Sequence, residues 1–221
     1  MVTLPMNKEA TQMTDPGFVG HTELIGEVCG VSDVTIMLAS DQLIVTHVST
    51  HCSLAEAIRR ATQPRIRTIL KLTSDAVARL IENPRIAVAG LNPHAGENGL
   101  FGREEIDVIA PAVARAAARG IRCKGPFAAD TVFLKAFAGE YDGVLSMYHD
   151  QGQIATKLKG FNRGITVTAG LETVFTTPAH GTAFDIVGQG RADTGALERA
   201  VHLGARLAAA RKRSKLAATA A

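Results

Sequence analysis

Three histidines are placed where they could bind a metal ion together. His51, His94 and His149 each come a few residues after a short apolar run that is typical of a buried strand. In open α/β sheets, ligands bind beyond the carboxyl ends of the strands, so side chains far apart in sequence can converge there. Imidazole is a good ligand for divalent metals, and three protein ligands leave a position open for a substrate. Each histidine could instead be an ordinary polar loop residue, and the residues alone leave both interpretations open.

Carboxylates and a lysine accompany these histidines. Asp150 directly follows His149, and a carboxylate next to a metal-bound imidazole commonly orients its ring. Asp130 precedes an expected helix, where it could equally be a plain N-cap. Lys8 could hold an anion or be a solvated surface charge. We consider Asp150, Asp130 and Lys8 as candidates for proton transfer.

Two further features could contact an anionic substrate. His21 and Thr22 lie in a compact polar segment, although Thr22 could instead cap the helix that follows. Lys157 could hold an anion or be a surface charge. The segment 92–102 is rich in glycine, which lets a backbone approach a ligand closely. Neither the dinucleotide fingerprint GxGxxG nor the phosphate loop GxxxxGK[ST] occurs in the sequence.

The elements that must position these residues alternate between strands and helices. We expect strands at 43–48, 85–91, 143–147, 165–168 and 174–177. We expect helices from Ser53, with Glu56 completing a capping box, and over 66–82, 104–119 and 193–212. A polar loop is expected after 143–147. Strands separated by helices predict an α/β fold with a mainly parallel sheet.

The composition limits the function classes. The 221 residues are 46% hydrophobic and 20% charged with a net charge of +3, which predicts a folded chain with a substantial core. No apolar run approaches the roughly 18–20 residues of a membrane span, and the first residues do not resemble a signal peptide. We therefore expect a cytoplasmic protein without a membrane partner. Aromatic residues make up 5% and Trp is absent, which argues against a nucleic-acid partner. The three cysteines form no CxxC motif and are expected to be reduced.

Several longer motifs resemble one known family. They are NPHAGENGLFGREEID at 92–107, GPFAADT at 125–131, MYHDQG at 147–152 and HGTAFDIVGQGRAD at 180–193. GHTE at 20–23 and STH at 49–51 fit the same pattern. From about residue 2 to about residue 208, the sequence resembles the 4-hydroxythreonine-4-phosphate dehydrogenase family of vitamin B6 (pyridoxine) biosynthesis.

The resemblance implies an enzyme that oxidises a secondary alcohol of a small phosphorylated hydroxy acid with NAD, followed by decarboxylation. It implies a divalent metal (Zn, Mg, Mn or Co) held by His51, His94 and His149. It also implies a homodimer whose active site draws residues from both subunits. The substrate contacts implied by the motifs are His21, Thr22, Lys157 and Thr166.

Two positions depart from the family members of the vitamin pathway. Those members carry Asn and Arg where this chain has Thr166 and Phe175. An arginine fork is a strong anion clamp that phenylalanine cannot replace. The resemblance therefore implies a branch that acts on other four-carbon phosphorylated acids, such as threonate or erythronate phosphates, or on aromatic cis-dihydrodiols.

The resemblance also implies a domain organisation. The family has two α/β domains of the isocitrate/isopropylmalate dehydrogenase type, with the first built from both chain ends. By this analogy 1–24 and 179–221 form an incomplete first domain, and 25–178 form the metal- and substrate-binding domain. Two alternatives remain open from the residues: a metal-dependent hydrolase or lyase that uses the same histidines, and an inactive truncated remnant of the dehydrogenase.

Overall fold

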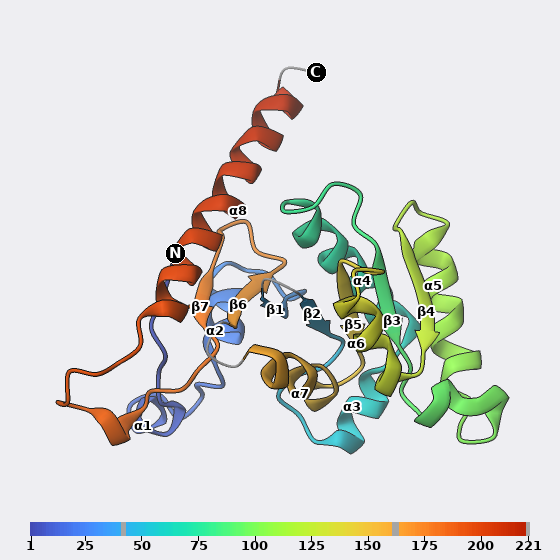
Figure 1. Ribbon diagram of the computed structural model, residues 1–221, viewed down its shortest axis with the longest axis horizontal. Coiled ribbons are helices and arrows are strands. Elements are labelled where there is room, and N and C mark those ends of the chain that lie inside the picture. The colour runs from blue at the N-terminus through green and yellow to red at the C-terminus, as the bar shows by residue number, and fades with distance from the viewer. Residues whose placement is uncertain (41–42, 161–163, 220–221) are drawn as a thin grey trace.

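A seven-stranded sheet organises the chain (Figure 1). The computed structural model describes residues 1–40, 43–160 and 164–219. The strands of these residues are β1 Thr35–Ala39, β2 Ile44–His47, β3 Ile86–Ala89, β4 Cys123–Phe127, β5 Gly143–Ser146, β6 Ile165–Ala169 and β7 Thr176–Pro178. The α-helices are α1 Lys8–Gln12, α2 His21–Val28, α3 Leu54–Arg60, α4 Gln63–Ala78, α5 Ala110–Ala117, α6 Ala129–Phe137, α7 His149–Gly160 and α8 Gly195–Thr219. Shorter helical segments are η1 Pro93–Gly99, the π-helical turn η2 Glu105–Ile109 and η4 Phe184–Ile186.

The sheet order is β4-β3-β5-β2-β1-β6-β7. Strands β4, β3, β5 and β2 are parallel to one another, whereas β1 is antiparallel to both β2 and β6 and β7 is antiparallel to β6. Five of the seven described strands therefore run in one direction, which confirms the α/β fold with a mainly parallel sheet. Because β3, β5 and β2 are parallel neighbours, the segments that follow them start at the same edge of the sheet.

Helices cover both faces of the sheet, and the apolar side chains of the strands alternate between two cores. Ile44 contributes to the core under α4, α5 and α8, whereas its neighbour Val45 contributes to the core under α6. The described strands other than β4 and β6 are buried along their whole length, as expected for a sheet covered on both sides. Figure 1 shows α8 at one end of the sheet and α5 with β4 at the other.

Each expected strand is present to within about two residues of its expected bounds, but two strands were missed. The short apolar run of β1 lies outside every expected element. Strand β4 has the sequence CKGPF, whose Gly and Pro argue against a strand. The proline is tolerated because β4 is the outermost strand of the sheet, where a missing backbone N–H leaves no neighbouring strand unpaired.

The expectation of a polar loop after β5 was wrong, because α7 begins at His149. A tertiary contact fixes this helix: the Gln151 side chain accepts a hydrogen bond from the Met147 backbone N–H (2.7 Å) and donates one to the Gly90 carbonyl (2.8 Å). The expected helix over 104–119 is also interrupted, since it starts with the π-helical turn η2 before α5.

The expected helix at Ser53 is present, and the Ser53 hydroxyl accepts a hydrogen bond from the Glu56 N–H at 3.2 Å. The predicted capping box is only half formed, because the Glu56 carboxylate accepts hydrogen bonds from Arg59 and Arg60 rather than from the backbone N–H of Ser53.

The predicted division into two domains stays a prediction. Strand β7 belongs to the same sheet as the central strands, helix α8 packs against β6 and β7, and Val2 pairs with Thr176. Residues 220 and 221 of the predicted first domain lie outside the described residues. Within the described part of the chain, no helix combines the length and the apolar character that a membrane span requires.

Candidate functional site

Two of the three predicted histidines lie together at the carboxyl ends of the central parallel strands. His51 follows β2, and His149 is the first residue of α7 after β5. Their ring centroids lie 5.8 Å apart. Two imidazoles on one zinc ion would place their centroids about 5 Å apart, because a Zn–N bond is about 2.0–2.1 Å long. The pair therefore fits two ligands of one ion.

A carboxylate lies beside each of these two rings. Nδ1 of His51 lies 3.3 Å from Oε1 of Glu23, and Nδ1 of His149 lies 2.6 Å from Oδ1 of Asp150. Next to a carboxylate, Nδ1 is the protonated donor, so Nε2 keeps the lone pair that a metal ligand needs. Both rings thus have the tautomer and the orienting partner of metal-binding histidines. Sequence reasoning singled out Asp150 but not Glu23, although the GHTE motif contains it.

Lys8 adds positive charge near Glu23. The hydrogen bond to His51 holds the pKa of Glu23 below its ordinary value, and the charge of Lys8 acts in the same direction. Burial, followed by the charge of Lys8, lowers the pKa of His21. The other oxygen of Glu23, Oε2, is buried and has no hydrogen-bond partner among the described residues. Lys8, His21, Glu23 and His51 therefore form one electrostatic cluster.

A further histidine, His47, is the last residue of β2 and lies below the His51–His149 pair. The sequence predicted it only as part of the strand at 43–48. It is fully buried, and its ring lies 6.1 Å from the ring of His149. Burial lowers the pKa of His47 to about 4, so the ring is neutral at physiological pH. Gly152 of α7 packs directly on it: a Cβ on this glycine would lie 2.6 Å from Nε2 of His47 and 2.8 Å from Oγ of Ser146.

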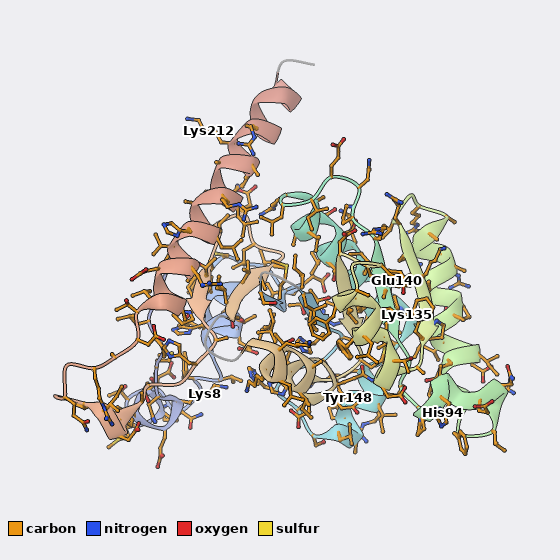
Figure 2. All side chains as sticks on the ribbon, viewed as in Figure 1. Lys8, His94, Lys135, Glu140, Tyr148 and Lys212 are labelled. Atoms are coloured by element: carbon orange, nitrogen blue, oxygen red, sulfur yellow. The ribbon has the colours of Figure 1, made fainter. Side chains whose placement is uncertain are left out.

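His94 does not join the other two histidines in a single chain. It is exposed on η1, the segment that follows β3, and its ring lies 6.2 Å from that of Phe101. Figure 2 shows His94 and Lys8 at opposite sides of the molecule, with Tyr148 between them. Among residues 1–40, 43–160 and 164–219, no three His, Cys, Asp or Glu side chains are close enough to hold a metal. The three-histidine ligand set stays a prediction.

The remaining candidates are distributed along the same edge and on the sheet. Asp150 is largely exposed, and Asp130 is exposed in the first turn of α6, whose N-cap is Ala128. The interpretation of Asp130 as an N-cap is therefore wrong. Lys157 is exposed on α7, and Thr166 is half-buried on β6.

Thr22 does not cap α2, because the N-cap is Gly20. Its side chain is buried, and its hydroxyl lies 3.2 Å from that of Thr168 on β6. Phe175 is also buried, with its ring 5.6 Å from that of His21. The position where the resemblance implies an arginine in the vitamin-pathway members is thus occupied by an apolar ring beside His21, a predicted substrate contact.

A cavity of about 550 Å³ lies next to the histidine pair. Its lining includes Thr22, Glu23 and His47 together with the two arginines Arg59 and Arg65. Its size is within the range of small-molecule sites, about 300–1,000 Å³. The described residues thus place two imidazoles, their carboxylate partners and a cavity of small-molecule size at one end of the parallel strands.

The chain is similar to curated enzymes that oxidise phosphorylated hydroxy acids. It is 49% identical over 208 residues to 4-hydroxythreonine-4-phosphate dehydrogenase of Beijerinckia indica, covering 94% of this chain and 62% of that protein. It is 44% identical over 209 residues to D-threonate 4-phosphate dehydrogenase of Pectobacterium atrosepticum, covering 94% of this chain and 64% of that protein. The chain therefore spans just under two thirds of the length of these relatives.

Solved structures agree in fold. The crystal structure of 4-hydroxythreonine-4-phosphate dehydrogenase from Klebsiella pneumoniae superposes with a TM-score of 0.81 at 44% identity, covering 92% of this chain and 64% of that chain. Isocitrate dehydrogenase from Methylococcus capsulatus superposes with a TM-score of 0.55 at 13% identity, covering 97% of this chain and 71% of that chain. The second likeness concerns the fold alone and confirms the predicted isocitrate-dehydrogenase-like architecture.

The family assignment rests on nearly the whole chain. The sequence profile described as "Pyridoxal phosphate biosynthetic protein PdxA" matches residues 1–204. This range contains every predicted site residue, from Lys8 to Thr166. The match confirms the resemblance drawn from the histidine-containing motifs, and the chain belongs to the family of the pyridoxal phosphate biosynthetic protein PdxA.

Proposed function

We propose that this chain acts as an NAD-dependent dehydrogenase on the secondary alcohol of a small phosphorylated hydroxy acid. The observation that carries the proposal is the pair His51 and His149, whose rings lie 5.8 Å apart and each place Nδ1 beside a carboxylate, which leaves Nε2 as the nitrogen for a divalent metal. The names of the relatives support the substrate class. We further propose a cytoplasmic location.

The complete site is proposed to form in a homodimer. His94 and the first turn of α6 with Asp130 lie on neighbouring segments, since α6 packs against η1. They are exposed and are not part of the His51–His149 pair. In a dimer, these two groups from one subunit would complete the pair of the other. The exposed apolar side chains Leu134 on α6 and Leu158 on α7 provide apolar surface for such a contact.

In this proposal the metal is held by His51, His149 and the partner's His94. When bound, a divalent metal lowers the pKa of a coordinated alcohol and stabilises negative charge on neighbouring oxygens. Glu23 and Asp150 hold the two imidazoles in the ligand tautomer. NAD, when bound, would supply the acceptor for the hydride of the alcohol carbon. Asp150, Asp130 and Lys8 are the candidates for taking up the hydroxyl proton. A 3-oxo acid formed in this way loses carbon dioxide.

The substrate is proposed to lie in the cavity beside Thr22, with His21, Lys157 and Thr166 as further contacts. Phe175 excludes the arginine clamp of the vitamin-pathway enzymes, because the ring is buried and occupies the space beside His21. We therefore propose D-threonate 4-phosphate or a similar four-carbon acid phosphate rather than 4-hydroxythreonine 4-phosphate. The relatives that carry the D-threonate name are consistent with this choice.

The test combines metal binding with turnover. The purified chain is titrated with Zn²⁺ or Co²⁺ by calorimetry, its mass is measured by native mass spectrometry, and NADH formation is followed with D-threonate 4-phosphate and with 4-hydroxythreonine 4-phosphate. We expect a dimer with about one metal per chain. We also expect NADH with D-threonate 4-phosphate. Metal-dependent hydrolysis of either phosphate without NADH would instead support a hydrolase and overturn the proposal.

Single-histidine variants locate the metal. His149→Ala and His94→Ala should each lower the metal affinity by at least tenfold, because loss of even an outer partner of a metal ligand costs about 10–100-fold. His202→Ala is the matched control, because His202 is an exposed histidine on α8, away from the site. Unchanged metal affinity in both site variants would show that the assigned ligands are wrong. Loss in His149→Ala but not in His94→Ala would refute the shared ligand set.

A further inference from the structure

The segment that carries His94 has an uncommon backbone. Five consecutive residues, from His94 to Asn98, have φ values of 51°, 51°, 81°, 42° and 55°. Only the central one, Gly96, is a glycine. The segment is therefore a left-handed helical turn built mostly from residues with side chains.

Such a turn is unfavourable by itself. In the left-handed conformation the Cβ atom crowds the following carbonyl oxygen, so L-residues adopt it singly and rarely in succession. A backbone of this kind persists only when its surroundings over-determine it, and it is concentrated at functional sites.

Glu105 of η2 holds this turn in place. Its side chain is buried, with 3% of the residue exposed. Oε1 accepts hydrogen bonds from the backbone N–H groups of Leu91 (2.6 Å) and Asn92 (2.7 Å), and Oε2 accepts one from Nδ2 of Asn92 (2.9 Å). The carboxylate thus binds the two residues that lead from β3 into the turn.

The same carboxylate fills the inside of the turn. A Cβ at Gly96 would lie 2.8 Å from Oε2 of Glu105, and a Cβ at Gly90 would lie 3.1 Å from Oε1. The absence of a side chain at Gly90 and Gly96 therefore leaves room for the Glu105 carboxylate. The sequence predicted that the glycine-rich backbone approaches a ligand closely, and here it approaches the Glu105 side chain. Burial opposes the charge of Glu105, but the hydrogen bonds from Asn92 and Leu91 outweigh it and lower its pKa.

We propose that Glu105 is a positioning residue that holds the left-handed turn in the conformation that presents His94 to the metal site. The inference rests on the proposed function, because it assumes that His94 is a ligand. Glu105 itself touches neither metal nor substrate in this proposal. It acts through Asn92 and through the space that Gly90 and Gly96 leave for it.

The test compares two neighbouring glutamates. Glu105→Gln keeps the size of the side chain, but its NH₂ group meets another donor, either Nδ2 of Asn92 or the backbone N–H groups. Glu104→Gln is the matched control, because Glu104 accepts a hydrogen bond from Nδ2 of Asn92 at 2.7 Å that the amide oxygen of Gln can still accept. Co²⁺ or Zn²⁺ affinity is measured by calorimetry, and hydrogen–deuterium exchange is measured over residues 92–101.

We expect Glu105→Gln to weaken metal binding at least tenfold and to speed exchange in residues 92–101, with exchange in β2 and β5 unchanged. Outer partners of metal ligands typically contribute about 10–100-fold in affinity. Glu104→Gln should change the affinity less than threefold. A Glu105→Gln variant with wild-type affinity and wild-type exchange would overturn the proposal, as would a uniform loss of protection across the whole sheet.

A second variant addresses the strain directly. Ala95 has φ 51°, where glycine is not penalised. Ala95→Gly should therefore restore part of the affinity lost in Glu105→Gln, whereas a purely structural role of Glu105 in the core predicts no such rescue. If the wild-type chain bound no metal, the proposed function would fail. If it bound metal through His94 but Glu105→Gln had no effect, only the present inference would fail.

Discussion

Gly152 gives the sharpest structural prediction, because it lies where α7 packs on the sheet beneath the histidine pair. A Cβ at this position would lie 2.6 Å from Nε2 of His47, 2.6 Å from Cγ1 of Val45 and 2.8 Å from Oγ of Ser146. All three of these residues are fully buried. Because these side chains cannot move out into solvent, Gly152→Ala must displace either α7 or the strands β2 and β5.

The magnitude follows from two opposing effects. Alanine is favoured over glycine inside a helix by about 1 kcal/mol. Overpacking of a well-packed core costs about 1–3 kcal/mol, and contacts below 3.0 Å on three sides place this site at the upper end. We expect a net loss of about 2 kcal/mol in the free energy of unfolding, which for a chain of this size lowers Tm by about 4–8 °C.

The assay is urea and thermal unfolding, with Gly181→Ala as the control. A Cβ at Gly181 would meet no heavy atom within 4 Å, so its stability should stay within about 0.5 kcal/mol of the wild type. In addition, Val45→Ala should cost at least about 1 kcal/mol less in the Gly152→Ala background, because it vacates the space that the new methyl group needs. Wild-type stability of Gly152→Ala, or strict additivity with Val45→Ala, would refute the described packing of α7.

Three further predictions concern the scaffold. Both carboxylate oxygens of Asp142 accept hydrogen bonds from the Arg85 side chain, and these bonds hold the pKa of Asp142 below its ordinary value of 3.8. The resulting stabilisation is present above pH 3.8 and is lost as the pH falls through the lowered pKa. The free energy of unfolding of Asp142→Asn should therefore depend less steeply on pH in acid than that of the wild type. The hydroxyls of Thr46 and Thr73 are buried and lie 2.7 Å apart, so Thr73→Val leaves the Thr46 hydroxyl without this partner. The variant should lose about 1–3 kcal/mol in the free energy of unfolding, measured in urea. If Thr73→Val cost no more than the double variant Thr46→Val/Thr73→Val, the pairing would be contradicted. Leu207→Ala on the buried face of α8 should cost about 2–5 kcal/mol, and a neutral result by thermal unfolding would show that α8 does not pack on the sheet.

The sequence by itself determined the fold class and most of the sheet. Short apolar runs between helical segments predicted an α/β fold, because a strand buried on both faces has to be apolar throughout. The position of His51 and His149 after such runs was enough to predict that they lie at one edge, since the carboxyl ends of adjacent parallel strands meet there. The family motifs around these histidines carried the rest of the functional prediction.

Only the tertiary structure decided how the site residues are held. The polar segment after β5 becomes α7 because Gln151 bonds to the ends of β3 and β5, which no local propensity encodes. The burial of His47 and the left-handed turn from His94 to Asn98 depend on side chains from other elements, above all Glu105 for the turn. The separation of His94 from the other two histidines is likewise a matter of where loops lie in space. Local patterns record which face of an element is apolar, but contacts between elements far apart in the chain decide where each polar side chain ends.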